Sequence, residues 1–329
     1  MSAGRSPLVT VIIPVFNRQE YVGQAIESIL RQTYTNFELI VIDDGSSDGT
    51  CDIVRTYTDE RVCLVRQDRN LGIPQTRNAG VHLARGKYVA FLDSDDVAYP
   101  RRLERQVSFL EWNPDYAAVG AWVSWMDRDG RPLSRIKRKP VSPRKIAALR
   151  LLQQGIENSA SMARTSILRE FPHNEMCPIS SDYELWARVA ARYKLSNLPE
   201  VLVRRRLHVQ QATKMRADRV RQSRQAVYAN QLSELGVPFT TKDLERHGSL
   251  RGMQKQKFTP DDSYVEWAEH WLLLLSKANC RTTTYPEPEF SRLLRKLWLG
   301  VCWRSRLSVG WLIWARLVIS ALLLTRRPT

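Results

Sequence analysis

Residues 9–50 decide the fold class, and their sequence is VTVIIPVFNRQEYVGQAIESILRQTYTNFELIVIDDGSSDGT. The stretch begins with a run of β-branched residues and ends with a second apolar run that stops at two aspartates. Between these runs, apolar residues recur at the three- and four-residue spacing of an amphipathic helix. Strand, helix and strand in this order predict two parallel strands joined by a right-handed crossover.

The same alternation continues beyond residue 50. The predicted strands are 8–15, 37–42, 62–66, 88–92 and 117–123, and the predicted helices are 21–32, about 47–57, 73–84 and about 101–112. This order predicts an α/β fold with a mostly parallel sheet that has helices on both faces. In such sheets, ligands bind beyond the carboxyl ends of the strands.

The second half of the chain is less regular. The sequence predicts a polar, basic linker over roughly 127–145, an amphipathic helix over 180–192 and a last strand over 202–206. From about residue 208 the pattern is helical to the end, with breaks at 236–238 and 286–288. The chain is therefore expected to carry an α-helical C-terminal extension.

The charge of the chain is strongly positive, with a formal net charge of +16 over 329 residues. Basic residues concentrate at 131–150 and at 204–224, and Asp218 is the only acidic residue of the second stretch. Such patches attract phosphate on nucleic acid, lipid headgroups or nucleotides, although a solvated helix face is the plain alternative. The five scattered cysteines form no CxxC pair, which argues against a disulfide framework or a zinc site and indicates a reducing compartment.

Two apolar segments bear on export and membrane binding. Residues 5–16 form a short run that contains Pro14 and lacks a small-residue cleavage site, so we interpret them as a buried strand. Residues 307–324 are almost wholly apolar apart from Arg316. A charged residue at the centre of a span costs about 2.5–3.5 kcal/mol on insertion scales. We therefore expect residues 307–324 to lie in a membrane interface or to pack on the protein.

Acidic residues directly follow the predicted strand 88–92. They are Asp93, Asp95 and Asp96. Side chains alternate along a strand, so Asp93 and Asp95, which have one residue between them, can point the same way. Their oxygen ligands suit a hard ion such as Mg²⁺ or Mn²⁺ that arrives with phosphates. The alternative is a turn in which Asp96 caps the next helix.

A second acidic pair, Asp43 and Asp44, follows the strand 37–42. A carboxylate at this position can accept a hydrogen bond from a base or a ribose, as in dinucleotide sites. The alternative is an Asx turn with helix capping by Ser47 or Asp48. Neither GxGxxG nor GxxxxGK[ST] occurs here, so a dinucleotide or P-loop site would lack its phosphate cradle.

Four segments, in order, resemble glycosyltransferase family 2, whose members have the GT-A fold. The segments are 9–50, NLGIPQTRNAGVHLARGKYVAFLDSDD at 70–96, SDYELWARVA at 181–190 and RRRLHVQQAT at 204–213. The resemblance implies a GT-A catalytic domain over 1–213. Its nucleotide-sugar half would cover about 1–125 and its acceptor half about 126–213, with residues 214–329 as the helical extension.

The resemblance also implies which residues bind the donor. Pro14, Phe16 and Asp44 would line the nucleotide base, with Asp44 accepting from a base N–H. Arg77 would approach the nucleotide or the donor sugar. The segment that closes over the diphosphate would supply Arg206, His208, Gln211 and Thr213.

The metal ligands and the catalytic base follow from the same resemblance. Asp93 and Asp95 match the metal-binding DxD, and His208 is a further candidate ligand. Asp182 matches the catalytic base of an inverting displacement, and the alternative for it is an ordinary helix N-cap. Family members often carry Glu before this aspartate, whereas this chain has Ser181.

The resemblance implies a metal-dependent hexosyltransferase that uses Mn²⁺ or Mg²⁺. It would move a sugar from a nucleotide-sugar, with UDP favoured by the fit of Asp44 to uracil, onto a glycan or polyprenyl-linked acceptor in cell-surface polysaccharide biosynthesis. The basic C-terminal region would dock on an anionic membrane, which places the protein in the cytoplasm on the inner face of the cell membrane. The sequence leaves open the donor sugar and base, the acceptor and linkage, and the oligomeric state. It also leaves open whether residues 307–324 span the membrane, lie on it or pack on the protein.

Three alternatives from other classes remain at this point. A catalytically inactive glycan-binding scaffold would not need Asp93, Asp95 and Asp182. A nucleic-acid-binding protein would use the positive charge, but its aspartate clusters would repel phosphate without a metal. A nucleotidyltransferase would need a glycine-rich phosphate loop after the first strand, and residues 14–21 do not form one.

Overall fold

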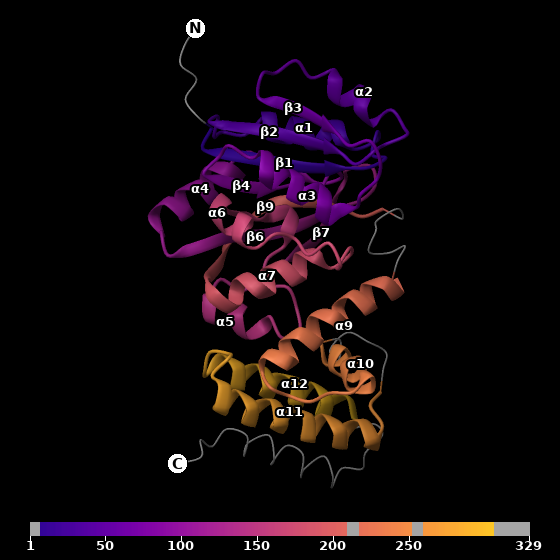
Figure 1. Ribbon diagram of the computed structural model, residues 1–329, viewed down its shortest axis with the longest axis vertical. Coiled ribbons are helices and arrows are strands. Elements are labelled where there is room, and N and C mark those ends of the chain that lie inside the picture. The colour runs from indigo at the N-terminus through magenta and orange to yellow at the C-terminus, as the bar shows by residue number, and fades with distance from the viewer. Residues whose placement is uncertain (1–6, 209–216, 252–258, 306–329) are drawn as a thin grey trace. The chain divides into compact units, whose positions relative to one another are not determined.

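The structure is a computed structural model of the chain. It describes residues 7–208, 217–251 and 259–305. These residues separate into two compact units, the first made of residues up to 146 with 154–220, and the second made of 147–153 with the residues from 221 onward. Figure 1 labels the elements of both units.

The first unit is built on one mixed β-sheet. Its strands are β1 (Val9–Val15), β2 (Phe37–Asp43), β3 (Val62–Arg66), β4 (Tyr88–Phe91), β5 (Val97–Ala98), β6 (Tyr116–Met126), β7 (Pro132–Lys137), β8 (Met162–Arg164) and β9 (Lys194–Arg206). Within the described residues they lie in the order β3-β2-β1-β4-β8-β6-β9-β5, with β7 paired to β6. The first four strands are parallel and so is the pair β6 and β9, whereas β5, β7 and β8 pair antiparallel.

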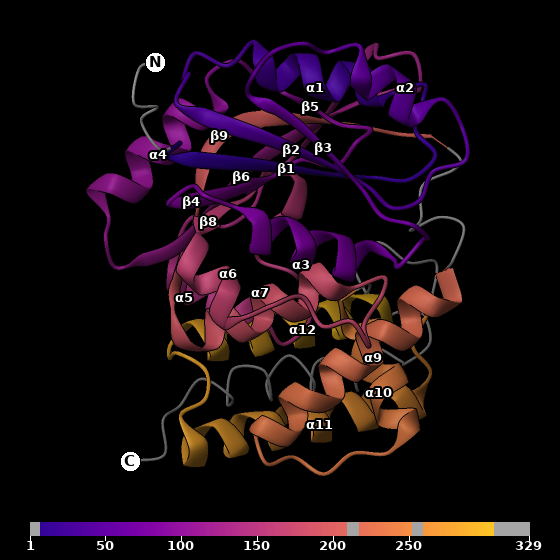
Figure 2. The same cartoon turned by 45° about the horizontal axis from the view of Figure 1, so that its top comes forward.

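Helices cover both faces of this sheet, as Figure 2 shows. They are α1 (Val22–Leu30), α2 (Thr50–Arg55), α3 (Ile73–Leu83), α4 (Arg102–Trp112), α6 (Thr165–Glu170) and α7 (Ser181–Arg192), while α5 (Pro143–Leu149) leads into the second unit. Side chains of β1 alternate between two cores. Val11 and Ile13 pack with α1 and α4, and Ile12 packs with α3, α6 and α7. Because both faces are buried, β1 and β2 are continuous apolar runs.

The predicted α/β class with a GT-A-like sheet is confirmed, but the predicted linker over 127–145 is wrong. This segment forms β7 and the start of α5. Nearly every side chain of β7 is exposed, so no alternation of apolar and polar residues marks it as a strand. The last strand also begins at Lys194, well before the predicted residue 202.

The second unit is helical. It contains most of α9 (Ala217–Glu234) together with α10 (Thr241–Leu250), α11 (Asp262–Thr282) and α12 (Glu289–Ser305). These helices confirm the helical character predicted for this part of the chain. Trp271, Phe290 and Trp298 belong to the hydrophobic core of this unit. Among the helices that the structure describes, none has the length and apolarity needed to cross a bilayer. The apolar segment 307–324 lies outside the described residues.

Candidate functional site

A tight acidic turn follows β4. The backbone N–H of Asp96 donates to the carbonyl of Asp93 at 3.0 Å, which closes the turn. The three carboxylates in the turn would repel one another without counter-charges. Each lies against a different basic side chain: Arg77 for Asp93, His208 for Asp95 and Arg205 for Asp96.

Arg77 extends from α3 to the first carboxylate of the turn. Its Nη2 donates to Oδ1 of Asp93 at 2.9 Å, and its own side chain is buried. Burial raises the pKa of Asp93, and the positive charge of Arg77 opposes this rise. Arg77 is therefore engaged by the acidic turn, and its predicted approach to the nucleotide or donor sugar stays a prediction.

His208 lies against the middle carboxylate. Its Nε2 is 2.7 Å from Oδ2 of Asp95, and its ring centroid is 5.1 Å from that of Tyr21. Burial acts to raise the pKa of Asp95, but the hydrogen bond and charge of His208 outweigh it, so this pKa lies below its usual value. The structure thus brings together two of the residues predicted to bind a metal.

Arg206 holds the acidic turn from inside the protein. Its backbone N–H donates to Asp96 at 3.0 Å. Its guanidinium donates to the carbonyls of Asp95 at 3.0 Å and Arg128 at 2.8 Å, and to Gln24 at 2.6 Å. Arg206 therefore supports the acidic turn, and its predicted contact with the diphosphate stays a prediction. All three guanidinium nitrogens donate within the protein, and the residue is only 1% exposed.

Asp95 and His208 are the pair that best fits a divalent metal. The ring nitrogen of His208 that faces Asp95 is Nε2. The other ring nitrogen, Nδ1, is buried and has no hydrogen-bond partner among the described residues. In the described part of the chain, no group of three or more His, Cys, Asp or Glu is arranged as a complete metal site. Mg²⁺ and Mn²⁺ usually combine one or two carboxylates with phosphates and water. The residues present therefore fit such an ion when a diphosphate completes its coordination.

The side chain of Asp44 binds the backbone of a loop beside the end of β2. Its two carboxylate oxygens accept from the backbone N–H groups of Leu71 at 2.7 Å and Gly72 at 2.9 Å. Gly45 makes this approach possible, because a Cβ there would lie 2.7 Å from the carbonyl carbon of Arg69, and its φ of +74° disfavours other residues. Each oxygen keeps a second lone pair, so a hydrogen bond from a base stays a prediction.

The structure places the other predicted base contacts at the end of β1. Pro14 is half-buried and Phe16 is 41% exposed. The backbone N–H of Asp44 donates to the carbonyl of Val15 at 2.8 Å, so the ends of β1 and β2 adjoin. Gln211 and Thr213 lie outside the described residues.

Asp182 lies in the first turn of α7. Its Oδ2 accepts from Nε2 of Gln154 at 2.9 Å, and its Oδ1 accepts from the backbone N–H of Tyr183 at 2.8 Å. Burial is the main cause of the raised pKa of Asp93, and the negative charge of Asp182 makes a small further contribution. The role of Asp182 as the base stays a prediction.

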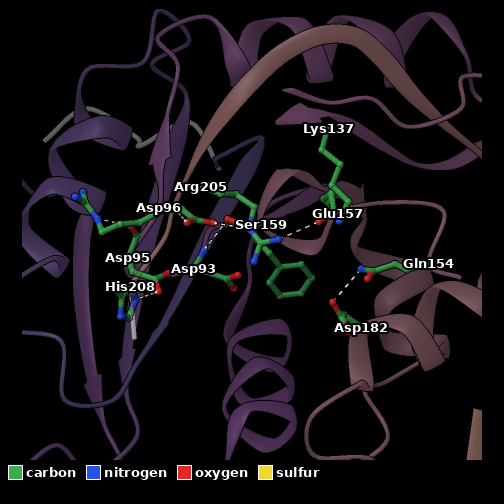
Figure 3. A network of polar contacts seen from close by, with 12 residues as sticks. Asp93, Asp95, Asp96, Lys137, Gln154, Glu157, Ser159, Asp182, Arg205 and His208 are labelled. Atoms are coloured by element: carbon green, nitrogen blue, oxygen red, sulfur yellow. Dashed lines mark hydrogen bonds and ion pairs between the residues drawn. The ribbon is translucent and has the colours of Figure 1, made fainter. Parts of the chain in front are cut away.

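Figure 3 shows a polar network that the sequence analysis did not identify. Arg205 lies between two acids, with Nη1 3.2 Å from Glu157 and Nε 3.7 Å from Asp96. Glu157 also pairs with Lys137 at 2.7 Å and Lys139 at 2.8 Å. The basic stretch 131–150 was a visible signal, but no motif pairs it with Glu157, which follows Lys139 by 18 residues.

The fold and these acidic strand ends define an α/β enzyme of the kind that binds nucleotide-linked substrates at one edge of its sheet. The model of the family described as "Glycosyl transferase family 2" matches residues 10–171. An uncharacterized glycosyltransferase of Methanocaldococcus jannaschii is 34% identical over 206 residues, which cover 61% of this chain and 71% of that protein. TuaG of Bacillus subtilis, a putative teichuronic acid biosynthesis glycosyltransferase, is 40% identical over 139 residues, or 41% of this chain and 54% of that protein. The chain belongs to glycosyltransferase family 2.

Solved structures share the fold at low sequence identity. Staphylococcus aureus TarS 1–349 in complex with UDP-GlcNAc has a TM-score of 0.56 at 17% identity, and the match covers 91% of this chain and 89% of that one. The mannosyltransferase PcManGT from Pyrobaculum calidifontis, in complex with GDP-Man and Mn²⁺, has a TM-score of 0.54 at 18% identity, with 97% and 87% covered.

Proposed function

We propose that this protein is an inverting, metal-dependent glycosyltransferase that moves a sugar from a nucleotide-sugar to a glycan or polyprenyl-linked acceptor. The observation that carries the proposal is the acidic turn at the end of β4, where His208 lies 2.7 Å from Asp95, in a chain that belongs to glycosyltransferase family 2. Asp182 would be the base, and the turn would mark the diphosphate side.

Asp182 would deprotonate the attacking hydroxyl of the acceptor. The N-terminal turn of α7 stabilises a negative charge, and Gln154 holds one carboxylate oxygen in place. A single base and a single displacement place the new bond on the face opposite the leaving group, which inverts the anomeric configuration.

The leaving diphosphate would be bound at the acidic turn. Asp95 and His208, with Asp93 adjacent, would hold a divalent metal, which when bound neutralises the developing charge on the leaving group. Asp44, Pro14 and Phe16 would face the base. Relatives and neighbours suggest the wider context, since TuaG is named for teichuronic acid biosynthesis and a TarS structure contains UDP-GlcNAc. We therefore propose a UDP-sugar donor and a role in polysaccharide synthesis at the cytoplasmic membrane surface, where the basic C-terminal region would dock.

Thermal unfolding with nucleotides tests the donor site. One nucleoside diphosphate among UDP, dTDP and GDP should raise the melting temperature by about 5–10 °C at a hundredfold excess over its Kd, and only with Mn²⁺ present. CMP with Mn²⁺ serves as the monophosphate control, because it lacks the second phosphate that completes the coordination of the ion. Absence of a shift with every nucleotide would contradict the donor site and favour an inactive scaffold.

Gln154 offers a test of how the base is positioned. Gln154→Leu should lower kcat about 10-fold to 100-fold, because a hydrogen bond to a charged group contributes about 1.5–3 kcal/mol. The melting temperature and the Kd of the nucleotide–Mn²⁺ complex should not change. In the Asp182→Asn background the same substitution should cost almost nothing further. Additive losses in the double variant would show that Gln154 acts independently of Asp182.

A further inference from the structure

In the network around Glu157, three cations lie against a single buried carboxylate. One carboxylate, buried with 5% of the residue exposed, is shared by Lys137, Lys139 and Arg205. Asp96 lies farther from Arg205, at 3.7 Å. Like charges held this close repel one another, and burial increases the repulsion because water screens it less.

Two of these cations also act on the ammonium group of Lys137. Its pKa is lowered to about 8, mainly by burial, and the positive charges of Lys139 and Arg205 contribute to this lowering against the attraction of Glu157. Its side chain is nevertheless 38% exposed, so a ligand can approach it from solvent. An anion bound beside Lys137 would relieve the repulsion.

The network around Glu157 is connected to Asp182, the proposed base, through Gln154. The Nζ atom of Lys139 donates to the carbonyl of Gln154 at 2.5 Å, and the side chain of Gln154 donates to Asp182. In Figure 3, Lys137 and Glu157 lie on the same side of Arg205 as Gln154 and Asp182, whereas Asp93, Asp95 and Asp96 lie on the other side. A ligand of the lysines would therefore lie on the side of Arg205 where Gln154 and Asp182 are.

The approach to the network is also positive. No acidic residue occurs between Asp129 and Glu157, while residues 131–150 contain eight lysines and arginines. Arg135 stacks over the ring of Trp125 with its Cζ 4.9 Å from the centroid, and Arg138 lies over Trp122 at 5.4 Å. A surface of this kind attracts anions that carry several charges.

We propose that Lys137 and Lys139, together with Arg205, form an anion-binding subsite for a phosphate or carboxylate group of the acceptor glycan. The acceptor of this enzyme is therefore an anionic glycan. The inference rests on the proposed function of the acidic turn and Asp182, and it adds the chemical class of the second substrate.

Binding of three defined oligomers to the full chain tests the subsite. The probes are inorganic polyphosphate, polygalacturonate and neutral dextran, titrated calorimetrically in 50 mM and 200 mM salt. Wild type should bind at least one anionic probe and not dextran, and the preferred probe distinguishes phosphate from carboxylate. Lys137→Gln/Lys139→Gln should weaken that binding at least about 10-fold. Lys137→Gln alone, which leaves Glu157 with two cations, should show a smaller loss.

The matched control is Arg31→Gln/Arg55→Gln. These two exposed arginines pair with Glu27 and Asp52 on α1 and α2, so the control removes the same charge elsewhere in the first unit. If both double variants bound the anionic probe equally weakly, the effect would be one of net charge and the proposal would be overturned. Failure of wild type to bind either anionic probe would also overturn it. The affinity for the nucleotide–Mn²⁺ complex should stay within about twofold in both variants. If Lys137→Gln/Lys139→Gln lost affinity for the nucleotide–Mn²⁺ complex, the two lysines would belong to the donor site instead. If wild type did not bind this complex, the proposed function itself would be overturned.

Discussion

Asp182→Asn should reduce sugar transfer by about 10²–10⁴-fold, the usual contribution of a general base. The amide keeps the shape of the side chain and the hydrogen bond to the backbone of Tyr183, but it cannot take a proton from an acceptor hydroxyl. The measurement is the initial rate of nucleotide release with saturating donor and acceptor. Donor binding should be unchanged, because the groups that would bind the diphosphate come from the acidic turn and not from α7.

Asp115→Asn is the control for this substitution. Asp115 is half-exposed and pairs with Lys194 on the surface, so its loss should leave the rate within about twofold. A rate close to wild type for Asp182→Asn would reject this residue as the base. A loss of nucleotide affinity equal to the loss of rate would show that Asp182 belongs to the donor site.

The second large effect is expected from Asp95→Asn. The amide can still accept from His208 across the present 2.7 Å contact, but it no longer offers a charged oxygen to a divalent ion. The metal-dependent rise in melting temperature with the nucleoside diphosphate should disappear, and transfer should fall at least about 100-fold because charge neutralisation by a metal contributes several kcal/mol.

Asp52→Asn provides the comparison for this variant. Asp52 is largely exposed and pairs with Arg55 at 2.9 Å, and its loss should leave the metal-dependent stabilisation intact. A normal Mn²⁺-dependent shift in Asp95→Asn would reject this residue as a ligand. A lower melting temperature of the variant without nucleotide or metal would instead indicate that the substitution disturbs the turn.

The buried strands could be predicted because both faces of the sheet are covered. Runs such as VTVIIPV in β1 contain apolar residues on both sides, and this signal is local. β7 could not be predicted in the same way. Its strand character comes from pairing with β6, while its exposed and basic side chains resemble those of a loop. The position of β8 between β4 and β6 is likewise set by its neighbours, since three residues carry no period.

The candidate site likewise contains residues that the sequence marks and partners that it does not. Asp93, Asp95 and Asp182 could be named because motifs mark them in sequence. His208 could also be named from its motif, although it lies 113 residues from Asp95. Gln154, which is 28 residues from Asp182, could not, because no motif marks it. The support that Arg206 gives to the acidic turn was also not visible in the sequence, because its partners Asp95 and Gln24 are distant along the chain.

The exposed strand β7 has a further consequence for solution behaviour. Within the described residues it pairs only with β6, so its other edge presents unpaired backbone groups, and Leu133 and Ile136 are 39% and 44% exposed. An edge of this kind is a template for pairing with another chain, and proteins commonly protect it with lysine and arginine. The positive charges of this hairpin therefore also oppose aggregation, because two copies that approach edge to edge repel each other.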